Sequence, residues 1–248
     1  VQAGWEVQWI ERFDGDGVLL GYIGSVIDIT DRKEAEERLR LRHDEEHRVV
    51  LRLQRALLPA RVVSIPGFDV ATHYAAAQNA FEVGGDWYET FTLGDGRLGV
   101  AVGDVVGHSL DAAMAMGQLR AGFLALSTFA DRPGRLLDAA DSFAVSHDIT
   151  DFATACCAFL DPGTGAVTYA SAGHPPMLLV PEQGPVAWLD GARSAPLGTG
   201  LGRGRDDATA VMEPGSVLVV FSDGLVERRR EVLDDGLARL AGLVDICR

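Results

Sequence analysis

The sequence predicts an α+β protein whose sheets are mostly antiparallel and carry helices on their outside. β-rich runs come before and after two adjacent helical segments, residues 110–130 and 131–145. A doubly wound parallel sheet would instead alternate strands with helices. Gly94-Asp95-Gly96 and Asp161-Pro162-Gly163-Thr164-Gly165 separate neighbouring apolar runs, as in antiparallel hairpins. The 248 residues suffice for one medium domain and an attachment.

The first predicted element is a β-hairpin. Residues 5–13 and 18–29 are β-rich and flank Asp14-Gly15-Asp16-Gly17. Asp-Gly between such runs is a strong hairpin signal, because glycine accepts a positive φ in the turn. The alternative for Asp14 and Asp16 is a calcium loop, but the rest of the EF-hand pattern is missing from this stretch.

A long helix is predicted from about residue 32 to residue 58, where Pro59 ends it. Thr30 or Asp31 is the expected cap, with Glu34 in the capping-box position relative to Asp31. Val50, Leu53 and Leu57 form an apolar stripe at helical spacing in the second half. The stripe is compatible with a homodimeric coiled coil or with packing on the next domain, and a solvated connector is the remaining alternative.

The remainder is predicted to contain nine strands and three helices. The strands cover residues 68–77, 87–92, 97–104, 153–160, 166–171, 177–180, 186–189, 208–212 and 216–221, and the helices residues 110–130, 131–145 and 232–246. Glycine and arginine dominate residues 191–205, which predicts a flexible loop.

The composition narrows the classes of function and the cellular location that the protein can have. The formal net charge of −14 disfavours non-specific binding to nucleic acid or to an anionic membrane. No apolar run is long enough for a membrane span, and no secretory segment is visible. Cys156, Cys157 and Cys247 form neither a disulfide framework nor a zinc pattern, which favours a reducing cytoplasm.

Three aspartates are the candidate catalytic and metal-binding residues. Asp86, Asp104 and Asp223 each follow an apolar run with glycine beside or near them, so we expect them at strand ends. Any one of these Asp-Gly pairs could simply be a turn. Together, as oxygen ligands without nearby zinc-type ligands, they indicate a hard cation such as Mg²⁺ or Mn²⁺. Carboxylates from separate strands are what a two-metal hydrolytic centre requires.

Five motifs occur in the order typical of a known family. They are Val83-Gly84-Gly85-Asp86-Trp87-Tyr88, Gly103-Asp104-Val105-Val106-Gly107-His108 with Ala112-Ala113, Ala172-Gly173-His174-Pro175-Pro176, Pro196-Leu197-Gly198, and Phe221-Ser222-Asp223-Gly224-Leu225-Val226-Glu227. In these motifs the chain resembles bacterial metal-dependent serine/threonine phosphatases of the PPM superfamily, in the sporulation stage II E and RsbU branch. Residues 53–59 resemble the entry sequence of the same family.

The resemblance implies a fold, a site and a substrate. The fold would be an antiparallel β-sandwich flanked by helices on both outer faces. Asp104 would bridge two Mn²⁺ or Mg²⁺ ions with the Val105 carbonyl as a further ligand, and Asp86 and Asp223 would each bind one ion. Gly85 would allow close approach of the backbone. The substrate would be a phosphoserine or phosphothreonine protein, typically an anti-sigma factor antagonist.

The resemblance also divides the chain. Residues 1–30 resemble the C-terminal strands of a PAS sensor domain, residues 31–59 form the linker helix, and residues 60–248 form the phosphatase domain. In the family a further Asp before a final strand completes a metal site. Here the sequence ends within the predicted last helix, where Asp245 does not match, so we expect that last strand to be lacking.

Two histidines and one glycine are possible supporting residues. His108 and His174 could act as general acids, or could cap and pack, and Gly224 follows the third aspartate. Two other functions stay open. A phosphatase-like binding module would capture a phosphoprotein without turnover. Another two-metal hydrolase, such as a phosphodiesterase, is disfavoured because no histidine-rich ligand motif and no basic groove are evident.

Overall fold

The computed structural model describes residues 4–59, 61–75, 84–107, 109–228 and 231–246, without the side chains of residues 43–44, 46–56 and 245. The chain divides into two compact units, residues 1–49 and 50–248. Helix α1 (Thr30–Leu57) crosses this boundary. No helix among the described residues is long and apolar enough to cross a membrane.

The first unit contains the predicted hairpin. Strands β1 (Trp5–Phe13) and β2 (Leu19–Asp28) are antiparallel. The Asp14 carboxylate accepts hydrogen bonds from the backbone amides of Asp16 at 3.0 Å and Val18 at 2.8 Å, so the Asp-Gly segment is a turn. The predicted helix cap was wrong. At the helix start, the backbone amide of Thr30 donates a hydrogen bond to the carboxylate of Asp28. The capping side chain is therefore that of Asp28, and neither Thr30 nor Asp31 takes this role.

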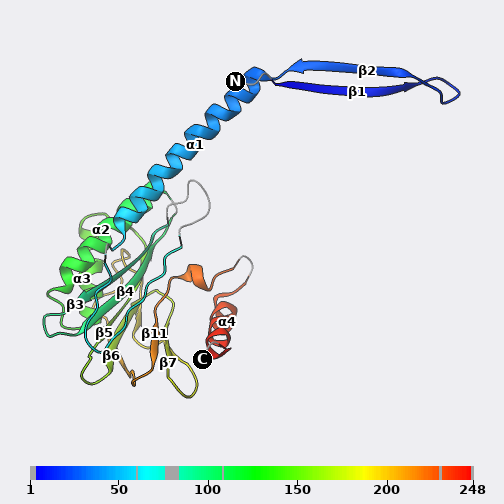
Figure 1. The fold of residues 1–248 in the computed structure, drawn as a ribbon. Coiled ribbons are helices and arrows are strands. Elements are labelled where there is room, and N and C mark those ends of the chain that lie inside the picture. Colours follow the sequence, from blue (N-terminus) through cyan, green and yellow to red (C-terminus); the bar gives the residue numbers. More distant parts are fainter. Residues whose placement is uncertain (1–3, 60, 76–83, 108, 229–230, 247–248) are drawn as a thin grey trace. The chain divides into compact units, whose positions relative to one another are not determined.

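The second unit is built on two sheets (Figure 1). In the larger sheet, the strand order is β10-β6-β5-β4-β3, and β9 pairs with β6. Its members are β3 (Asp86–Thr92), β4 (Leu98–Val105), β5 (Ala153–Leu160), β6 (Ala166–Ala172), β9 (Arg193–Ser194) and β10 (Ala208–Val211). The smaller sheet has the order β11-β7-β8, from β7 (Met177–Val180), β8 (Ala187–Leu189) and β11 (Val217–Val219). All pairings except β6–β9 are antiparallel.

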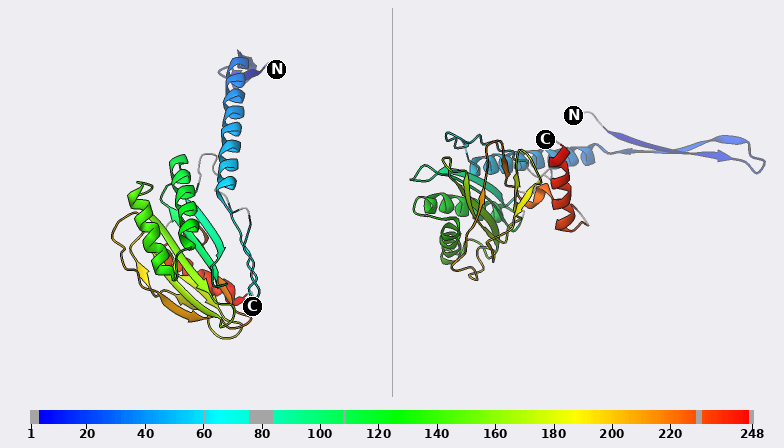
Figure 2. Two further views of the ribbon diagram at one scale, coloured as in Figure 1. Left: turned by 90° about the vertical axis from the view of Figure 1, so that its left-hand side faces the viewer. Right: turned by 90° about the horizontal axis from the view of Figure 1, so that it is seen from below.

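Helices α2 (Leu110–Ser127) and α3 (Pro133–Ser146) cover the outer face of the larger sheet, where Figures 1 and 2 show them side by side. Their apolar residues, such as Phe123 and Leu136, are fully buried against Trp87 and Phe159 of the sheet. Ser109 caps α2 by accepting a hydrogen bond from the Ala112 amide. This core fixes where α2 begins, a few residues after Asp104.

The two sheets pack face to face, and a last helix covers the outside of the smaller one. Leu98, Cys156 and Tyr169 of the larger sheet meet Met177 and Leu179 of the smaller sheet in the central core. On the other face of the smaller sheet, α4 (Leu233–Ile246) packs through the apolar residues Leu237, Leu240 and Val244. The predicted sandwich with helices on both outer faces is therefore confirmed.

One strand prediction for the second unit was wrong. Residues 69–75 form no strand, and of the predicted strand 68–77 only Phe68 makes an isolated bridge, to Ile65. Residues 76–77 lie outside the described part of the chain. The stretch predicted to be a flexible loop, residues 191–205, is a loop apart from the two-residue strand β9, and it ends at Arg205, whose side chain is fully buried.

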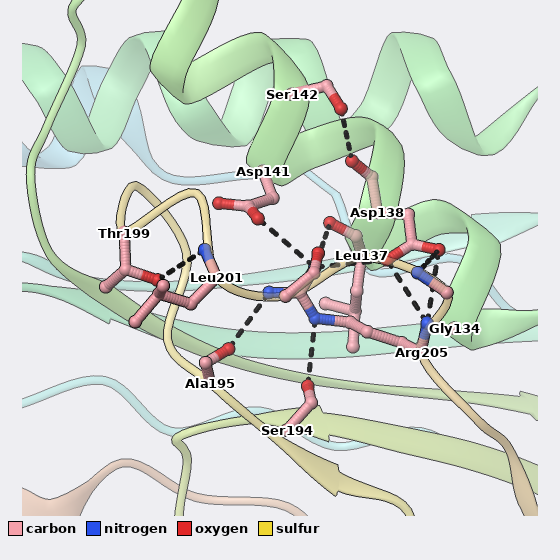
Figure 3. Close-up of polar contacts among 12 residues, drawn as sticks. Gly134, Leu137, Asp138, Asp141, Ser142, Ser194, Ala195, Thr199, Leu201 and Arg205 are labelled. Carbon is pink, nitrogen blue, oxygen red and sulfur yellow. Dashed lines mark hydrogen bonds and ion pairs between the residues drawn. The ribbon is translucent and has the colours of Figure 1, made fainter.

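Arg205 orders this loop (Figure 3). Its guanidinium donates to the Ser194 hydroxyl at 2.9 Å and to the Ala195 carbonyl at 2.9 Å, and it pairs with Asp138 and Asp141 of α3 at 3.2 and 3.4 Å. A buried guanidinium requires such partners for its donors. The loop is thus bound to α3 by specific polar contacts.

Candidate metal centre

Asp86, Asp104 and Asp223 come together at one end of the sandwich. A carboxylate oxygen from each lies within 4.8 Å of the other two. Asp86 and Asp104 are direct partners in the β3–β4 register, and Asp223 begins the short 3₁₀ helix Asp223–Leu225 that follows β11. Asp86 is the first residue of β3, so the expectation that it ends a strand was wrong. The antiparallel register places this strand start beside the end of β4.

Gly85 makes the close approach possible. Its carbonyl accepts a hydrogen bond from the Val105 amide at 3.1 Å, and a Cβ at position 85 would lie 1.9 Å from the Val105 carbonyl oxygen. Such a contact is impossible without displacing the backbone. The same Cβ would lie 2.8 Å from a carboxylate oxygen of Asp104. Only glycine therefore leaves room for this carbonyl and carboxylate together.

The electrostatics of the three carboxylates favour a bound cation. Burial and the neighbouring acids raise the pKa of Asp104 to about 7, and burial raises the pKa of Asp86 to about 6, with the charge of Asp223 adding to it. Hydrogen bonding from Ser222 offsets part of the shift in the pKa of Asp86. One Asp86 oxygen, Oδ1, is buried without a hydrogen-bond partner. An unpartnered buried oxygen among like charges fits the donor set of a hard divalent cation.

Two further residues of the predicted motifs have packing roles. The indole of Trp87 lies over Gly103, where a Cβ would come within 2.6 Å of the ring. The ring also packs against Phe123 of α2 at a centroid distance of 5.1 Å. Gly103 thus allows Trp87 to join β3 to α2 directly beside the carboxylates.

The three predicted supporting residues, His174, Gly224 and His108, do not share one environment. His174 is 1% exposed, and both of its ring nitrogens make hydrogen bonds within the protein, to Thr154 and to the Phe221 carbonyl. Gly224 is an exposed residue of the 3₁₀ helix. His108 lies outside the described residues. The ring of His174 therefore takes a structural position rather than facing a substrate.

Sequence reasoning missed two residues beside the cluster. Thr154 is the β5 partner of Asp104 and contacts His174, but nothing in its local sequence marks it. Ser222 precedes Asp223 directly, so its place in the motif could have indicated its contact with Asp86.

The fold and the carboxylate cluster define a helix-flanked sandwich with a candidate site for divalent cations. The chain belongs to the Stage II sporulation protein E (SpoIIE) family, whose pattern matches residues 94–248. This match includes Asp104 and Asp223, whereas Asp86 lies before it. The resemblance noted from the motifs is thereby confirmed.

Two curated relatives share this region. Protein IcfG from Synechocystis sp. is 26% identical over an alignment of 210 residues, which covers 71% of this chain and 32% of IcfG. Phosphoserine phosphatase RsbU from Bacillus subtilis is 25% identical over 187 residues, which are 75% of this chain and 55% of RsbU. The chain thus spans between about a third and about half of the length of these relatives.

Solved structures agree on the fold. The crystal structure of the RsbU and RsbW domains of Rv1364c from Mycobacterium tuberculosis matches with a TM-score of 0.62 and 35% identity, over 69% of this chain and 48% of that one. The SiaA-PP2C domain of Pseudomonas aeruginosa matches with a TM-score of 0.57 and 17% identity, over 85% of this chain and 91% of that one. The second unit therefore has the fold of PP2C phosphatase domains.

Proposed function

We propose that this chain is a metal-dependent protein serine/threonine phosphatase that binds two Mn²⁺ or Mg²⁺ ions. The observation that carries the proposal is the cluster of Asp86, Asp104 and Asp223 in a member of the SpoIIE family. The family resemblance of its motif gives Asp104 the role of holding both ions. Asp86 and Asp223 would each bind one ion, and the Val105 carbonyl beside Gly85 would be a further ligand.

The chemistry follows from the charges of the site. Two divalent cations, when bound, supply positive charge for the phosphoryl oxygens and lower the pKa of a coordinated water. The backbone positions Asp86 beside Asp104, because the two are paired across neighbouring strands, and Asp223 begins a short 3₁₀ helix. Without cations the three carboxylates would repel a phosphate group, as would the net charge of −14.

We further infer a phosphorylated protein as the substrate, of the anti-sigma factor antagonist type. The named activity of the relative RsbU, a phosphoserine phosphatase, supports a phosphoserine substrate. Residues 1–30 are proposed to be the end of a PAS sensor domain, and α1 is proposed to pair with a second copy in a homodimer. The free, buried thiols of Cys156 and Cys157 support a reducing cytoplasmic location.

Hydrolysis assays test the proposal, with phosphate release measured for the monoesters and release of the aryl alcohol measured for a diester. The substrates are an aryl phosphate monoester, a phosphoserine peptide and an aryl phosphodiester, each with Mn²⁺ and then with a chelator. We expect Mn²⁺-dependent hydrolysis of both monoesters and at least about a hundredfold loss in Asp104→Asn, because the cations supply several kcal/mol to such reactions. The exposed Asp69 provides a charge-matched control, Asp69→Asn, which should retain activity.

The other outcomes identify the alternatives. Mn²⁺ binding without hydrolysis of any substrate would contradict the proposed enzyme and favour the phosphatase-like binding module. Preferential hydrolysis of the diester would favour a phosphodiesterase.

A further inference from the structure

We propose that His174 is a positioning residue of the metal centre, whose imidazole links the strand beside Asp104 to the segment that leads to Asp223. The inference rests on the proposed function, because it concerns the distance between two of the proposed metal ligands. It assigns to His174 neither proton transfer nor contact with a substrate.

The two sheets create the need for such a link. Asp86 and Asp104 belong to the larger sheet, where the backbone register of β3 and β4 places them directly opposite each other. Asp223 follows β11 of the smaller sheet. The apolar core between the sheets is held by non-directional interactions, which do not define the position of one carboxylate relative to another. Hydrogen bonds have a defined length and direction, so they can define that position.

His174 lies where the chain passes from β6 of the larger sheet to β7 of the smaller one. Its backbone is anchored on both sides. The Ser171 hydroxyl donates to the His174 carbonyl at 3.1 Å, and the preceding residue, Gly173, bridges to Ala155 of β5. The ring therefore projects from a fixed position into the boundary between the sheets.

Both ring nitrogens are used: one reaches β5 of the larger sheet, and the other reaches the segment that follows β11 of the smaller sheet. Nε2 lies 2.9 Å from the Phe221 carbonyl oxygen, and Nδ1 lies 2.8 Å from the Thr154 hydroxyl. A carbonyl can only accept, so Nε2 carries the proton; in the neutral ring Nδ1 then accepts from Thr154. Burial lowers the pKa of His174 to about 4, so the ring is neutral at physiological pH.

Each partner of the ring lies close in the backbone to a proposed metal ligand. Thr154 is the register partner of Asp104 in β5, and Phe221 precedes Asp223 by two residues. The connection Thr154–His174–Phe221 therefore links β5 of the larger sheet to the segment after β11, next to the carboxylates. Loss of either hydrogen bond leaves a buried polar group unpaired and releases one side of this connection.

The experiment measures the Mn²⁺ concentration that half-saturates binding in a calorimetric titration, with the rise in melting temperature at one fixed Mn²⁺ concentration as a second readout. Thr154→Val removes the hydroxyl while keeping the side-chain shape, and Thr154→Ser restores it. His174→Phe removes both hydrogen bonds and keeps a ring. Ser127→Ala is the control, because it removes a similarly buried hydroxyl bond, to the Leu124 carbonyl in α2. All variants are made in the whole chain.

We expect Thr154→Val and His174→Phe to raise the half-saturating Mn²⁺ concentration about tenfold or more, the usual effect of removing groups that orient metal ligands. Thr154→Ser should stay within about twofold of wild type. Ser127→Ala should lower the melting temperature without changing the Mn²⁺ concentration required. If His174→Phe does not fold, the comparison of Thr154→Val with Thr154→Ser decides.

Two results would overturn the inference. Unchanged Mn²⁺ affinity in Thr154→Val, beside a wild type that Mn²⁺ stabilises, would show that the connection only supports folding and would leave the proposed function intact. No stabilisation of wild type by Mn²⁺ would overturn the inference and the proposed metal-dependent function together.

Discussion

Replacing Asp104 by asparagine should stabilise the metal-free protein. Burial and the charges of Asp86 and Asp223 raise the pKa of Asp104 from an ordinary 3.8 to about 7. Above that pH the folded protein therefore contains an ionised carboxylate that its surroundings disfavour. Asparagine has nearly the same shape and no charge, so Asp104→Asn removes the repulsion.

The magnitude follows from the shift in pKa. About three units at 1.36 kcal/mol each set an upper bound of about 4 kcal/mol. Asp104 is only partly buried, and water screens its charge, so we expect about 1–2 kcal/mol. For a unit of about 200 residues this corresponds to a melting temperature about 2–8 °C higher.

The size of this stabilisation depends on pH. A group whose folded pKa is raised contributes stability that is complete below its unfolded pKa, near 4, and is lost as the pH rises through about 7. The advantage of Asp104→Asn in the absence of metal should therefore be large at pH 8 and small at pH 5. With saturating Mn²⁺ at pH 8 the order should reverse, because the cation stabilises only the protein that retains its ligand.

The assay is thermal unfolding of wild type, Asp104→Asn and Asp69→Asn at both pH values, in chelator and in Mn²⁺. Asp69→Asn removes an exposed carboxylate outside the cluster and should follow wild type in every condition. A melting temperature of Asp104→Asn below that of wild type at pH 8 in chelator would refute the reasoning, since the carboxylate would then be stabilised by its surroundings.

Two further predictions concern the backbone contact and the ordered loop. Gly85→Ala should destabilise the protein by about 1–3 kcal/mol and weaken Mn²⁺ binding, because the added Cβ would overlap the Val105 carbonyl. The control is Gly94→Ala, whose added Cβ would have no atom within 4 Å. This control should be nearly neutral in thermal unfolding and in Mn²⁺ titration. Equal effects of the two would contradict the close approach. Arg205→Met should lower the melting temperature by about 6–12 °C, because loss of the buried cation lowers the free energy of unfolding by about 3 kcal/mol. The control Arg203→Met, at an exposed position, should change the melting temperature little. A small effect of Arg205→Met would show that its ion pairs do not hold the loop.

Much of the fold could be predicted from local sequence. The Asp14–Gly17 turn, the strands on either side of Gly94-Asp95-Gly96 and the helix that starts at Pro133 depend on turn residues, alternation and capping, which act between near neighbours. The wrong prediction of a strand at residues 68–77 has the same origin. Its composition favours β structure, but a strand also needs a partner, and residues 69–75 have no strand partner in the described structure.

The sequence alone also identified the three aspartates, since each stands beside or near glycine in an ordered motif. The tertiary structure decided how they meet: the β3–β4 register pairs Asp86 with Asp104, and the second sheet brings in Asp223. It also decided that Arg205 orders a loop whose glycines predicted flexibility, and that His174 joins the sheets through Thr154. Turns and helix ends are determined by residues adjacent in the chain, whereas strand register and the pairing of buried polar groups depend on residues far apart in sequence, whose proximity only the folded chain establishes.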